Sequence, residues 1–248
     1  MERIDTNSFH LLDHGHLRLV SYTQPVPGMV VPEWSGDLEA VRNARVSYAA
    51  DWRAGEDAGK DAKLLKRLVE HNHTTPLEAV VFTFDIKCPI FIARQWHRHR
   101  TWSYNEVSAR YTELPEEFYV PELDIIGKQH STDKQMREIG EFNEEHGFFA
   151  EAIEQHSELC FKRYKIALEK GIPRELARMF LPLNTYTHFF GTVDLHNLFH
   201  FIKLRLDPHA QYEIQVYAHA LLKLAETVCP VLVKEFAEKN NFVAYIED

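Results

Sequence analysis

The amino-acid sequence predicts one α+β domain with a largely antiparallel sheet flanked by long helices. Segments with strand character are few, and long stretches of helical periodicity separate them, which is typical of that class. The chain has 248 residues, enough to bury a core without disulfides or metals. It contains no fixed-period repeat and no Gly/Ser/Pro-rich linker, so we expect residues 1–248 to form a single domain.

The first 36 residues are predicted to be mostly irregular, with one strand at Leu17–Tyr22. We assign no role to this N-terminal extension. Asp37 is expected to cap a first helix, because apolar residues follow it at helical spacing. Leucine and valine side chains on one helical face predict a second helix over Asp61–Glu70.

The middle of the chain holds the clearest strand, Ala79–Lys87, which is rich in β-branched and aromatic residues. Pro89 suits the first position of a helix that continues through Ile90–Trp96. The basic and aromatic stretch from there to Tyr111 is expected to be a loop followed by a strand.

A helical pattern extends over Thr132–Lys170, with Gly140 and Gly147 as points where it can bend or break. Pro173 can start another helix, which Pro182 should end.

The last part of the chain alternates once more between strand and helix. Aromatic and β-branched residues predict a strand at Thr185–Val193. Asp194 should cap the helix that follows, and Asp207-Pro208 should open a long C-terminal helix.

Composition excludes several classes of protein. Apolar residues make up 45% and charged residues 26%, as in globular proteins and unlike disordered or membrane proteins. The formal net charge of -9 disfavours a general polyanion binder. The N-terminus lacks the pattern of an export signal, and Cys88, Cys160 and Cys229 lie too far apart for a disulfide framework or a zinc site. We therefore expect a cytoplasmic protein that binds neither membrane nor nucleic acid.

A basic and aromatic cluster extends from Arg94 to Arg110. Four arginines against Glu106 give this cluster a net charge of +3 within a chain of net charge -9. Guanidinium groups near apolar flanks need anionic or aromatic partners, and their planar fork matches phosphate. Hydroxyl, amide and carboxylate groups in the cluster can contact a sugar and a base. The cluster predicts a nucleotide site, to which Thr75 in the turn before Pro76 can add a hydroxyl.

Two other functions stay open on the residues alone. His97, His99 and Glu106 are similar to a metal-ligand set. His196 and His200 are four residues apart on a predicted helix, as metal ligands can be. A metal-dependent enzyme is therefore the alternative hypothesis, although the nearby arginines repel a cation. An RNA-binding module that stacks bases on the aromatic residues of the cluster is a third, which the negative net charge disfavours.

The cluster also contains Arg98-His99-Arg100 and, after seven residues, Ser108. This arrangement resembles the RHR-x7-S signature of the flavin-dependent thymidylate synthases. A second block, Arg178–Asn184 continuing to Leu204–Ile214, is similar to the C-terminal half of that family. The resemblance covers about Asp37–Phe236.

The resemblance implies reductive methylation of dUMP to dTMP, with 5,10-methylenetetrahydrofolate as carbon donor, FAD as redox cofactor and NADPH as electron source. Uracil C5 is a poor nucleophile, and an arginine beside the pyrimidine stabilises negative charge that develops at N3 and the carbonyl oxygens. By resemblance this catalytic residue is Arg205, which the sequence alone would place at a helix C-terminus. No cysteine lies in the signature, and we interpret Ser108 as a ligand-binding hydroxyl.

The other site residues are carried over from the matching positions. The residues that the resemblance assigns to dUMP are Gln95, Trp96, His97, Arg98, Glu106, Val107, Ser108, Ala109, Arg110, Arg178 and Arg205. Those that it assigns to FAD are Thr75, Arg98, His99, Arg100, Glu106, Asp194, Leu195, His196 and His200. The family often has asparagine and arginine on the helix where this chain has Asp194, His196 and His200. The resemblance implies no metal.

The family is homotetrameric, and each of its active sites is assembled from several subunits. We carry both properties over as expectations. A shared site would explain why a cluster of arginines finds few partners within one chain.

Overall fold

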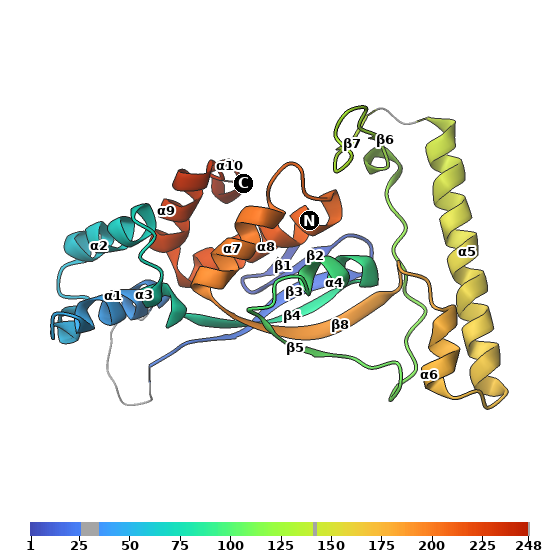
Figure 1. Ribbon diagram of the computed structural model, residues 1–248, viewed down its shortest axis with the longest axis horizontal. Helices are drawn as coiled ribbons and strands as arrows, with labels where there is room; N and C mark the ends of the chain where they lie inside the picture. The colour runs from blue at the N-terminus through green and yellow to red at the C-terminus, as the bar shows by residue number, and fades with distance from the viewer. Residues whose placement is uncertain (26–34, 141–142, 248) are drawn as a thin grey trace.

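The structure is a computed structural model that describes residues 1–25, 35–140 and 143–247. Its centre is a six-stranded antiparallel sheet of order β1-β2-β3-β4-β8-β5 (Figure 1). The strands of this sheet are β1 Glu2–Asp5, β2 Ser8–Leu11, β3 Gly15–Tyr22, β4 Val81–Pro89, β5 Ser103–Glu106 and β8 Tyr186–Asp194. The α+β prediction with a largely antiparallel sheet is confirmed.

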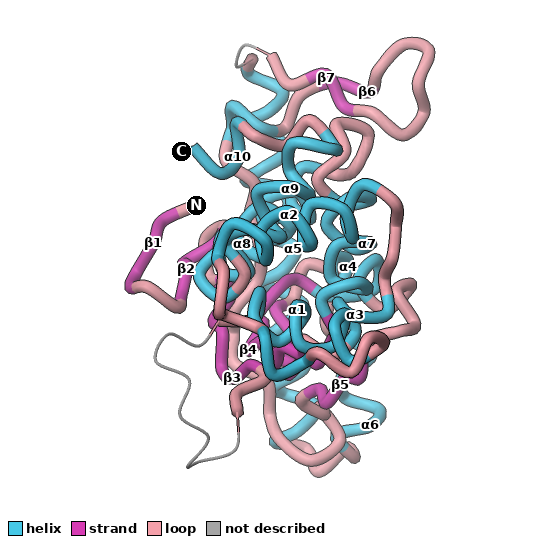
Figure 2. The backbone as a smooth tube through the Cα atoms, turned by 90° about the vertical axis from the view of Figure 1, so that its left-hand side faces the viewer, coloured by secondary structure: helices cyan, strands magenta, loops and turns pink. Residues whose placement is uncertain are grey.

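Helices cover one face of the sheet and extend beyond both of its ends (Figures 1 and 2). The helices are α1 Gly36–Val46, α2 Ala58–Glu70, α3 Thr75–Glu78, α4 Ile90–Trp96, α5 Glu144–Glu169, α6 Arg174–Ala177, α7 Leu195–Arg205, α8 Tyr212–Val228, α9 Pro230–Asn240 and α10 Ala244–Glu247. Short 3-10 helices lie at Asp51–Arg53, Leu123–Ile125 and Arg178–Phe180. No described helix is long and apolar enough to cross a membrane.

The main core lies between the sheet and the helices that cover it. Successive side chains of a strand point to opposite faces, so Phe82, Phe84 and Ile86 of β4 are fully buried against the helical layer. Between them, Thr83 and Asp85 point to the other face, which we call the outer face of the sheet. A second, smaller core joins α5 to α6, away from the sheet (Figure 1).

The prediction of an irregular N-terminus was wrong, because β1, β2 and β3 add three strands to one edge of the sheet. Only β3 overlaps the predicted strand. The other two are four residues long, so neither provides an apolar run from which a strand could be predicted. Residues 26–34, which include most of the predicted proline-rich loop, lie outside the described residues.

Asp37 does not cap the first helix. The N-cap is Ser35, whose side chain accepts from the Leu38 N–H. Asp37 is the second residue of α1 and is buried. Its carboxylate accepts hydrogen bonds from the Val231 and Leu232 N–H groups at 2.8 and 3.0 Å. It therefore satisfies two of the free N–H groups at the start of α9.

The predicted helix over Thr132–Lys170 is wrong in its first third. The chain there forms a small hairpin of β6 Lys128–Gln129 and β7 Arg137–Glu138. Helix α5 begins only after Asn143, whose side chain caps it by accepting from the His146 N–H at 3.0 Å. Gly147 lies within α5 and does not break it.

The predicted C-terminal helix is divided in two. Helix α8 begins at Tyr212, four residues after Pro208, and Cys229 separates it from α9. Pro230 occupies the first position of α9, where a missing N–H costs nothing. The predicted cap at Asp194 is confirmed, because its carboxylate accepts from the Asn197 N–H at 2.9 Å.

Candidate nucleotide and flavin site

Arg205 lies at the C-terminus of α7, next to the turn that follows α4. Its Nε donates to Nε2 of His99 at 3.0 Å, and its Nη2 donates to the Gln95 carbonyl at 3.3 Å. The Gln95 side chain in turn donates to Gln211 Oε1 at 2.6 Å. We call Arg205, His99, Gln95 and the neighbouring Arg98 the Arg205 group. Two contacts on different atoms fix the plane of the Arg205 guanidinium.

Burial sets the electrostatics of this group. It lowers the pKa of His99 to about 4, with smaller contributions from the charges of Arg205 and His200. His99 is therefore neutral at neutral pH, and its Nε2 can accept from Arg205. Burial, followed by repulsion from Arg98, also lowers the pKa of Arg205. The partly buried Arg205 guanidinium and the exposed Arg98 guanidinium repel each other, and an anionic ligand between them would relieve this repulsion.

The aromatic residues of the cluster hold the turn that carries Arg98. Trp96 is fully buried, and its ring lies 4.7 Å from that of Phe201 and 5.5 Å from that of Trp102, centroid to centroid. The Tyr104 hydroxyl lies 3.1 Å from the Trp96 carbonyl and 2.9 Å from the His99 carbonyl. Trp96 therefore belongs to the core, and within one chain no part of it is exposed for contact with a ligand.

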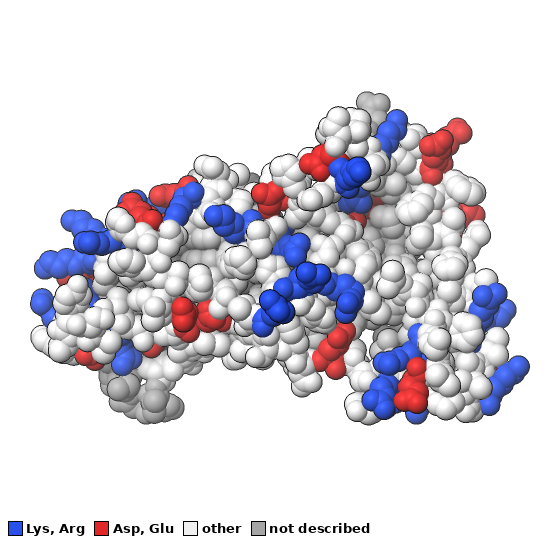
Figure 3. Space-filling view, in the orientation of Figure 1, with Lys and Arg blue, Asp and Glu red and all other residues white. Residues whose placement is uncertain are grey.

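His97 packs its ring edge-on against Tyr104, with centroids 4.6 Å apart. Its Nε2 is buried and has no hydrogen-bond partner among the described residues. Basic side chains gather over α4 and the turn after it, in the middle of the face shown in Figure 3. The predicted basic cluster is thus a surface feature built on an aromatic core.

Ser108, Arg110 and Arg178 form a second group, with Glu175 between the two arginines. The Arg110 N–H donates to Ser108 Oγ at 3.3 Å, and Arg110 Nη2 lies 3.4 Å from Glu175 Oε2. Arg178 Nε donates to the Glu175 carbonyl at 3.4 Å. We call these four residues the Ser108 group. It lies where the chain leaves β5 and meets α6.

Glu106, the last residue of β5, precedes the Ser108 group. Its Oε1 accepts from the Thr187 hydroxyl on β8 at 2.5 Å, and the Val107 N–H donates to the His188 carbonyl at 2.9 Å. Ala109 is buried. Nearby, burial and then the charge of Glu106 raise the pKa of the Cys88 thiol well above its usual range. This thiol stays protonated and cannot serve as a nucleophile.

Three of the residues assigned to the flavin line two adjoining hollows. His196 and His200 line a hollow of about 210 Å³, together with His73 and Thr74 from the turn before α3. Thr75 lines a larger hollow of about 600 Å³, which shares His73 with the first. The rings of His99 and His200 lie 5.9 Å apart, so the first hollow adjoins the Arg205 group.

The other flavin positions are less open. Leu195 is fully buried, and its N–H donates to the Val80 carbonyl at 2.8 Å. The Asp194 carboxylate is occupied as a cap, since it also accepts from the Asn197 side chain at 2.6 Å. Arg100 is exposed on the turn after His99.

Within the described part of one chain, the Arg205 group and the Ser108 group are not bonded directly to each other. No hydrogen bond or ion pair among residues 1–25, 35–140 and 143–247 joins the Arg205 group to the Ser108 group. The structure therefore brings together the predicted residues around Arg205 and, separately, those around Ser108.

The alternative metal site is not formed. His99 Nε2 accepts from Arg205, and the Glu106 carboxylate accepts from Thr187. One set of three side chains in the described part of the chain has its possible metal-ligand atoms within 4.8 Å of one another. It consists of His16, Asp85 and His188. The hypothesis of a metal-dependent enzyme built on His97, His99 and Glu106 was therefore wrong.

Sequence reasoning did not assign a role to Gln211. It lies in the block that resembles the family, but nothing in its spacing points to Gln95, from which 116 positions separate it. The contact arises because the start of α8 packs beside α4.

Comparison with known proteins places the chain in a family. The family model described as "Thymidylate synthase complementing protein" matches residues 30–231. The flavin-dependent thymidylate synthase of one Thermus thermophilus strain is 44% identical over 228 residues, which cover 92% of this chain and 77% of the relative. That of Treponema denticola is 42% identical and covers 95% of this chain and 85% of the relative.

A solved structure is also similar over nearly the whole chain. It is the UMP/dUMP methylase PolB from Streptomyces cacaoi bound with 5-Br dUMP, with a TM-score of 0.79 and 30% sequence identity. The match covers 93% of this chain and 97% of the other. The basic signature, the fold and these relatives agree, and the chain belongs to the Thy1 family of flavin-dependent thymidylate synthases.

Proposed function

We propose that this protein methylates dUMP to dTMP reductively, with 5,10-methylenetetrahydrofolate as carbon donor and NADPH as electron source. The observation that carries the proposal is Arg205, a partly buried cation oriented by His99 and Gln95 beside a second arginine. A site that concentrates positive charge in a chain of net charge -9 fits a nucleotide monophosphate. The names of the relatives and the 5-Br dUMP bound to PolB support the same substrate class.

Arg205 is the proposed catalytic residue. Its Nε and one Nη2 hydrogen are used by His99 and Gln95, and its remaining N–H groups make no hydrogen bond with the described residues. These groups are free to donate to N3 or a carbonyl oxygen of the pyrimidine, where negative charge develops as C5 becomes nucleophilic. A donor that is fixed before the reaction and partly shielded from water stabilises such charge strongly.

The proposed phosphate site is the Ser108 group. Its arginines offer two guanidinium forks, and the Ser108 hydroxyl offers a further donor. The only carboxylate that contacts Arg110 among the described residues is that of Glu175, which is itself about half exposed. A phosphate can replace this weak surface ion pair at little cost.

We further infer a homotetramer in which the Arg205 group of one subunit faces the Ser108 group of another. Either group alone provides half of a nucleotide site. Large apolar side chains surround the Ser108 group and are exposed in one chain: Tyr111 at 81%, Met179 at 78% and Leu183 at 69%. Such apolar surface around charged residues is typical of a protein–protein interface.

The two adjoining hollows, one beside α7 and the other beside α1, α2 and α3, fit a flavin nucleotide. His73, Thr74, Thr75, His196 and His200 provide donors without a bare carboxylate facing them. Because His99 Nε2 accepts from Arg205, its proton lies on Nδ1, which is a further donor. We assign FAD to Thr75, His99, His196, His200, Arg98, Arg100 and Glu106. Asp194 and Leu195 hold the start of α7 beside it, Asp194 as the helix cap and Leu195 through its N–H bond to the Val80 carbonyl. When bound, FAD carries electrons from NADPH to the one-carbon unit.

The remaining proposals concern the whole chain. We propose that residues 1–248 act as one domain, since the N-terminal strands extend the central sheet. A cytoplasmic location is supported by three cysteines that are all free thiols. We propose no nucleic acid or membrane partner.

The test is the absorption spectrum of the purified protein, followed by NADPH oxidation in the presence of 5,10-methylenetetrahydrofolate with dUMP, with UMP and with neither. We expect a yellow protein with a flavin spectrum, and NADPH oxidation that depends on dUMP and yields dTMP. Activity on UMP alone would correct the substrate while leaving the reaction class intact. A colourless protein that binds no added FAD, and whose NADPH oxidation does not change when dUMP is added, would contradict the proposal.

A further inference from the structure

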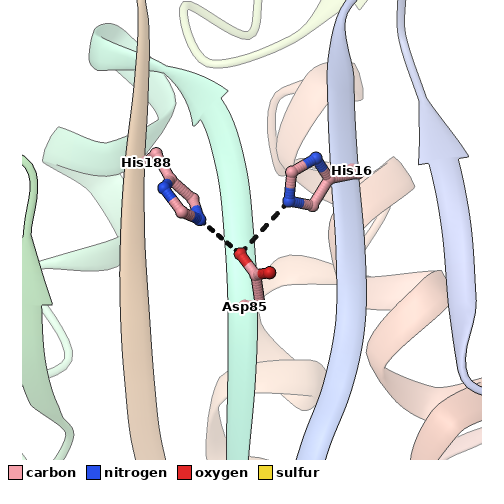
Figure 4. A group of neighbouring side chains, drawn as sticks. All are labelled: His16, Asp85 and His188. Carbon is pink, nitrogen blue, oxygen red and sulfur yellow. Dashed lines mark hydrogen bonds and ion pairs between the residues drawn. The ribbon is translucent and has the colours of Figure 1, made fainter.

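Three neighbouring strands bring two imidazoles and a carboxylate together on the outer face of the sheet (Figure 4). His16 comes from β3, Asp85 from β4 and His188 from β8. His16 and His188 both stand opposite Lys87 in the register, two positions along β4 from Asp85. The antiparallel register places the two histidines on either side of Lys87, and from there both imidazoles reach diagonally to the Asp85 carboxylate (Figure 4).

Both imidazoles point at the same carboxylate oxygen. His16 Nε2 lies 3.1 Å from Asp85 Oδ1, and His188 Nε2 also contacts Oδ1. The three ligand atoms all lie within 4.8 Å of one another. An ion with ligand bonds of about 2.0–2.2 Å holds tetrahedral ligands roughly 3.5 Å apart, so small side-chain movements suffice.

The carboxylate is buried, whereas the imidazoles reach the surface. The Asp85 side chain is 4% exposed, and those of His16 and His188 are 35% and 46% exposed. Because part of each imidazole is exposed, an ion can approach the buried carboxylate from the outer face of the sheet. Its open coordination positions would face outward, where water can fill them.

The nearby cations do not occupy the oxygen that the ion would need. Arg18 Nη2 contacts the other carboxylate oxygen, Oδ2, at 2.5 Å. A hydrogen-bonded second oxygen is typical of carboxylates that ligate metals, because the outer partner fixes their orientation. Lys87 stands between the two histidines in the register, and its ammonium is paired with Glu117 Oε2 at 2.7 Å, which offsets its charge.

We propose that His16, Asp85 and His188 form a binding site for Zn²⁺, or for a divalent transition metal of similar ligand preference, that links β3, β4 and β8. Two nitrogens and one carboxylate oxygen suit such ions, whereas Mg²⁺ and Ca²⁺ require oxygen ligands. The site takes no part in the proposed methylation. Asp85 lies between Phe84 and Ile86, which face the helical layer, so the metal site and the Arg205 group are on opposite sides of the sheet.

The experiment is a Zn²⁺ titration of the metal-stripped, tag-free full chain against a chromophoric chelator. All proteins carry Cys160→Ser, because Cys160 Sγ lies 3.5 Å from His156 Nε2 and offers a competing surface site. The variants are His16→Ala and His188→Ala. The matched control is His10→Ala, which removes an imidazole from the neighbouring strand β2, opposite His16 in the register. Circular dichroism confirms that each variant is folded.

We expect the parent and His10→Ala to bind one Zn²⁺ per chain with equal affinity. Loss of a ligand should weaken binding by at least the roughly 10- to 100-fold that loss of an outer partner costs. Zn²⁺ should also raise the Tm of the parent and of His10→Ala, but not that of His188→Ala. Equal affinity in all four proteins, or no Zn²⁺ bound by the parent, would overturn the proposal.

A second measurement needs no variant of the three ligands. Co²⁺ bound to the Cys160→Ser parent should give the visible bands of a nitrogen and oxygen site. A thiolate charge-transfer band would instead place the ion at another cysteine and overturn the assignment.

Discussion

Replacing Arg205 by alanine tests the role that the geometry gives it. The change removes one oriented cation and leaves His99 Nε2 and the Gln95 carbonyl without their donor. Losing one preorganised donor at a developing anion costs about 2.7–4 kcal/mol in the transition state, a roughly 100- to 1,000-fold fall in kcat. The loss of two hydrogen bonds is partly offset, because the variant no longer buries a cation and no longer holds it against the repulsion of Arg98. We therefore expect the free energy of unfolding to fall by less than about 2 kcal/mol.

Arg205→Lys is the matched variant. Lysine keeps the charge, but its single nitrogen cannot contact His99 and the Gln95 carbonyl while also presenting a fork to the pyrimidine. We expect its kcat to fall about 10- to 100-fold, between the parent and Arg205→Ala.

The assay is dUMP-dependent NADPH oxidation with dTMP measured directly, alongside flavin fluorescence to follow FAD binding. Both variants should still bind FAD, because His196 and His200 line a hollow in which Arg205 takes no part, and of the proposed FAD contacts only that of His99 depends on Arg205. Arg205→Ala with full kcat would refute the catalytic role. Loss of FAD together with activity would reassign Arg205 to the flavin.

Three further changes have defined outcomes. Gln211→Ala removes the acceptor 2.6 Å from Gln95 Nε2. Because one neutral hydrogen bond is lost, the KM for dUMP should rise about 2- to 10-fold while the affinity for FAD stays constant. An unchanged KM would show that Gln211 does not position Gln95 for dUMP. Burial raises the pKa of Asp37 from 3.8, its value in the unfolded chain, to about 6. Protonated Asp37 therefore adds to the free energy of unfolding below pH 3.8, and this contribution is lost as the pH rises through about 6. Asp37→Asn should therefore gain stability relative to the parent between these values in urea unfolding, and a constant difference across them would contradict the shift. A Cβ in Gly191→Ala would lie 3.0 Å from Trp102 Cε3 and 3.1 Å from Ile86 Cδ1; overpacking should cost about 1–3 kcal/mol in the same assay, and an unchanged midpoint would show that the ring can move freely.

Local sequence predicted those elements whose residues carry their own signal. Strands β4 and β8 are dense in β-branched and aromatic residues, and Asp194 caps α7 as expected. Strands β1 and β2 were not predicted, because each has only four residues and is stabilised by pairing with the adjacent strand of the sheet. The hairpin of β6 and β7 was not predicted either, because its charged residues fit the exposed surface of a helix equally well.

The site was predictable only in part. The resemblance to the family pointed to Arg98, His99 and Arg205, although 106 positions separate the last two. It could not indicate that Trp96 and Leu195 are buried, because a motif does not distinguish a side chain that touches a ligand from one that holds the backbone. Nor could the sequence indicate that the predicted residues gather in two groups, one around Arg205 and one around Ser108, since separate tertiary contacts form each of them.

The meeting of these two groups across subunits is the central claim, and mixing two inactive variants tests it most directly. Arg205→Ala and Arg178→Ala proteins would be combined in equal amounts, allowed to exchange subunits, and assayed for dTMP formation. If each site takes Arg205 from one subunit and Arg178 from another, random exchange should restore about one quarter of the parent activity. A mixture as inactive as either variant alone would mean that both arginines serve a site within one chain, and would contradict the account.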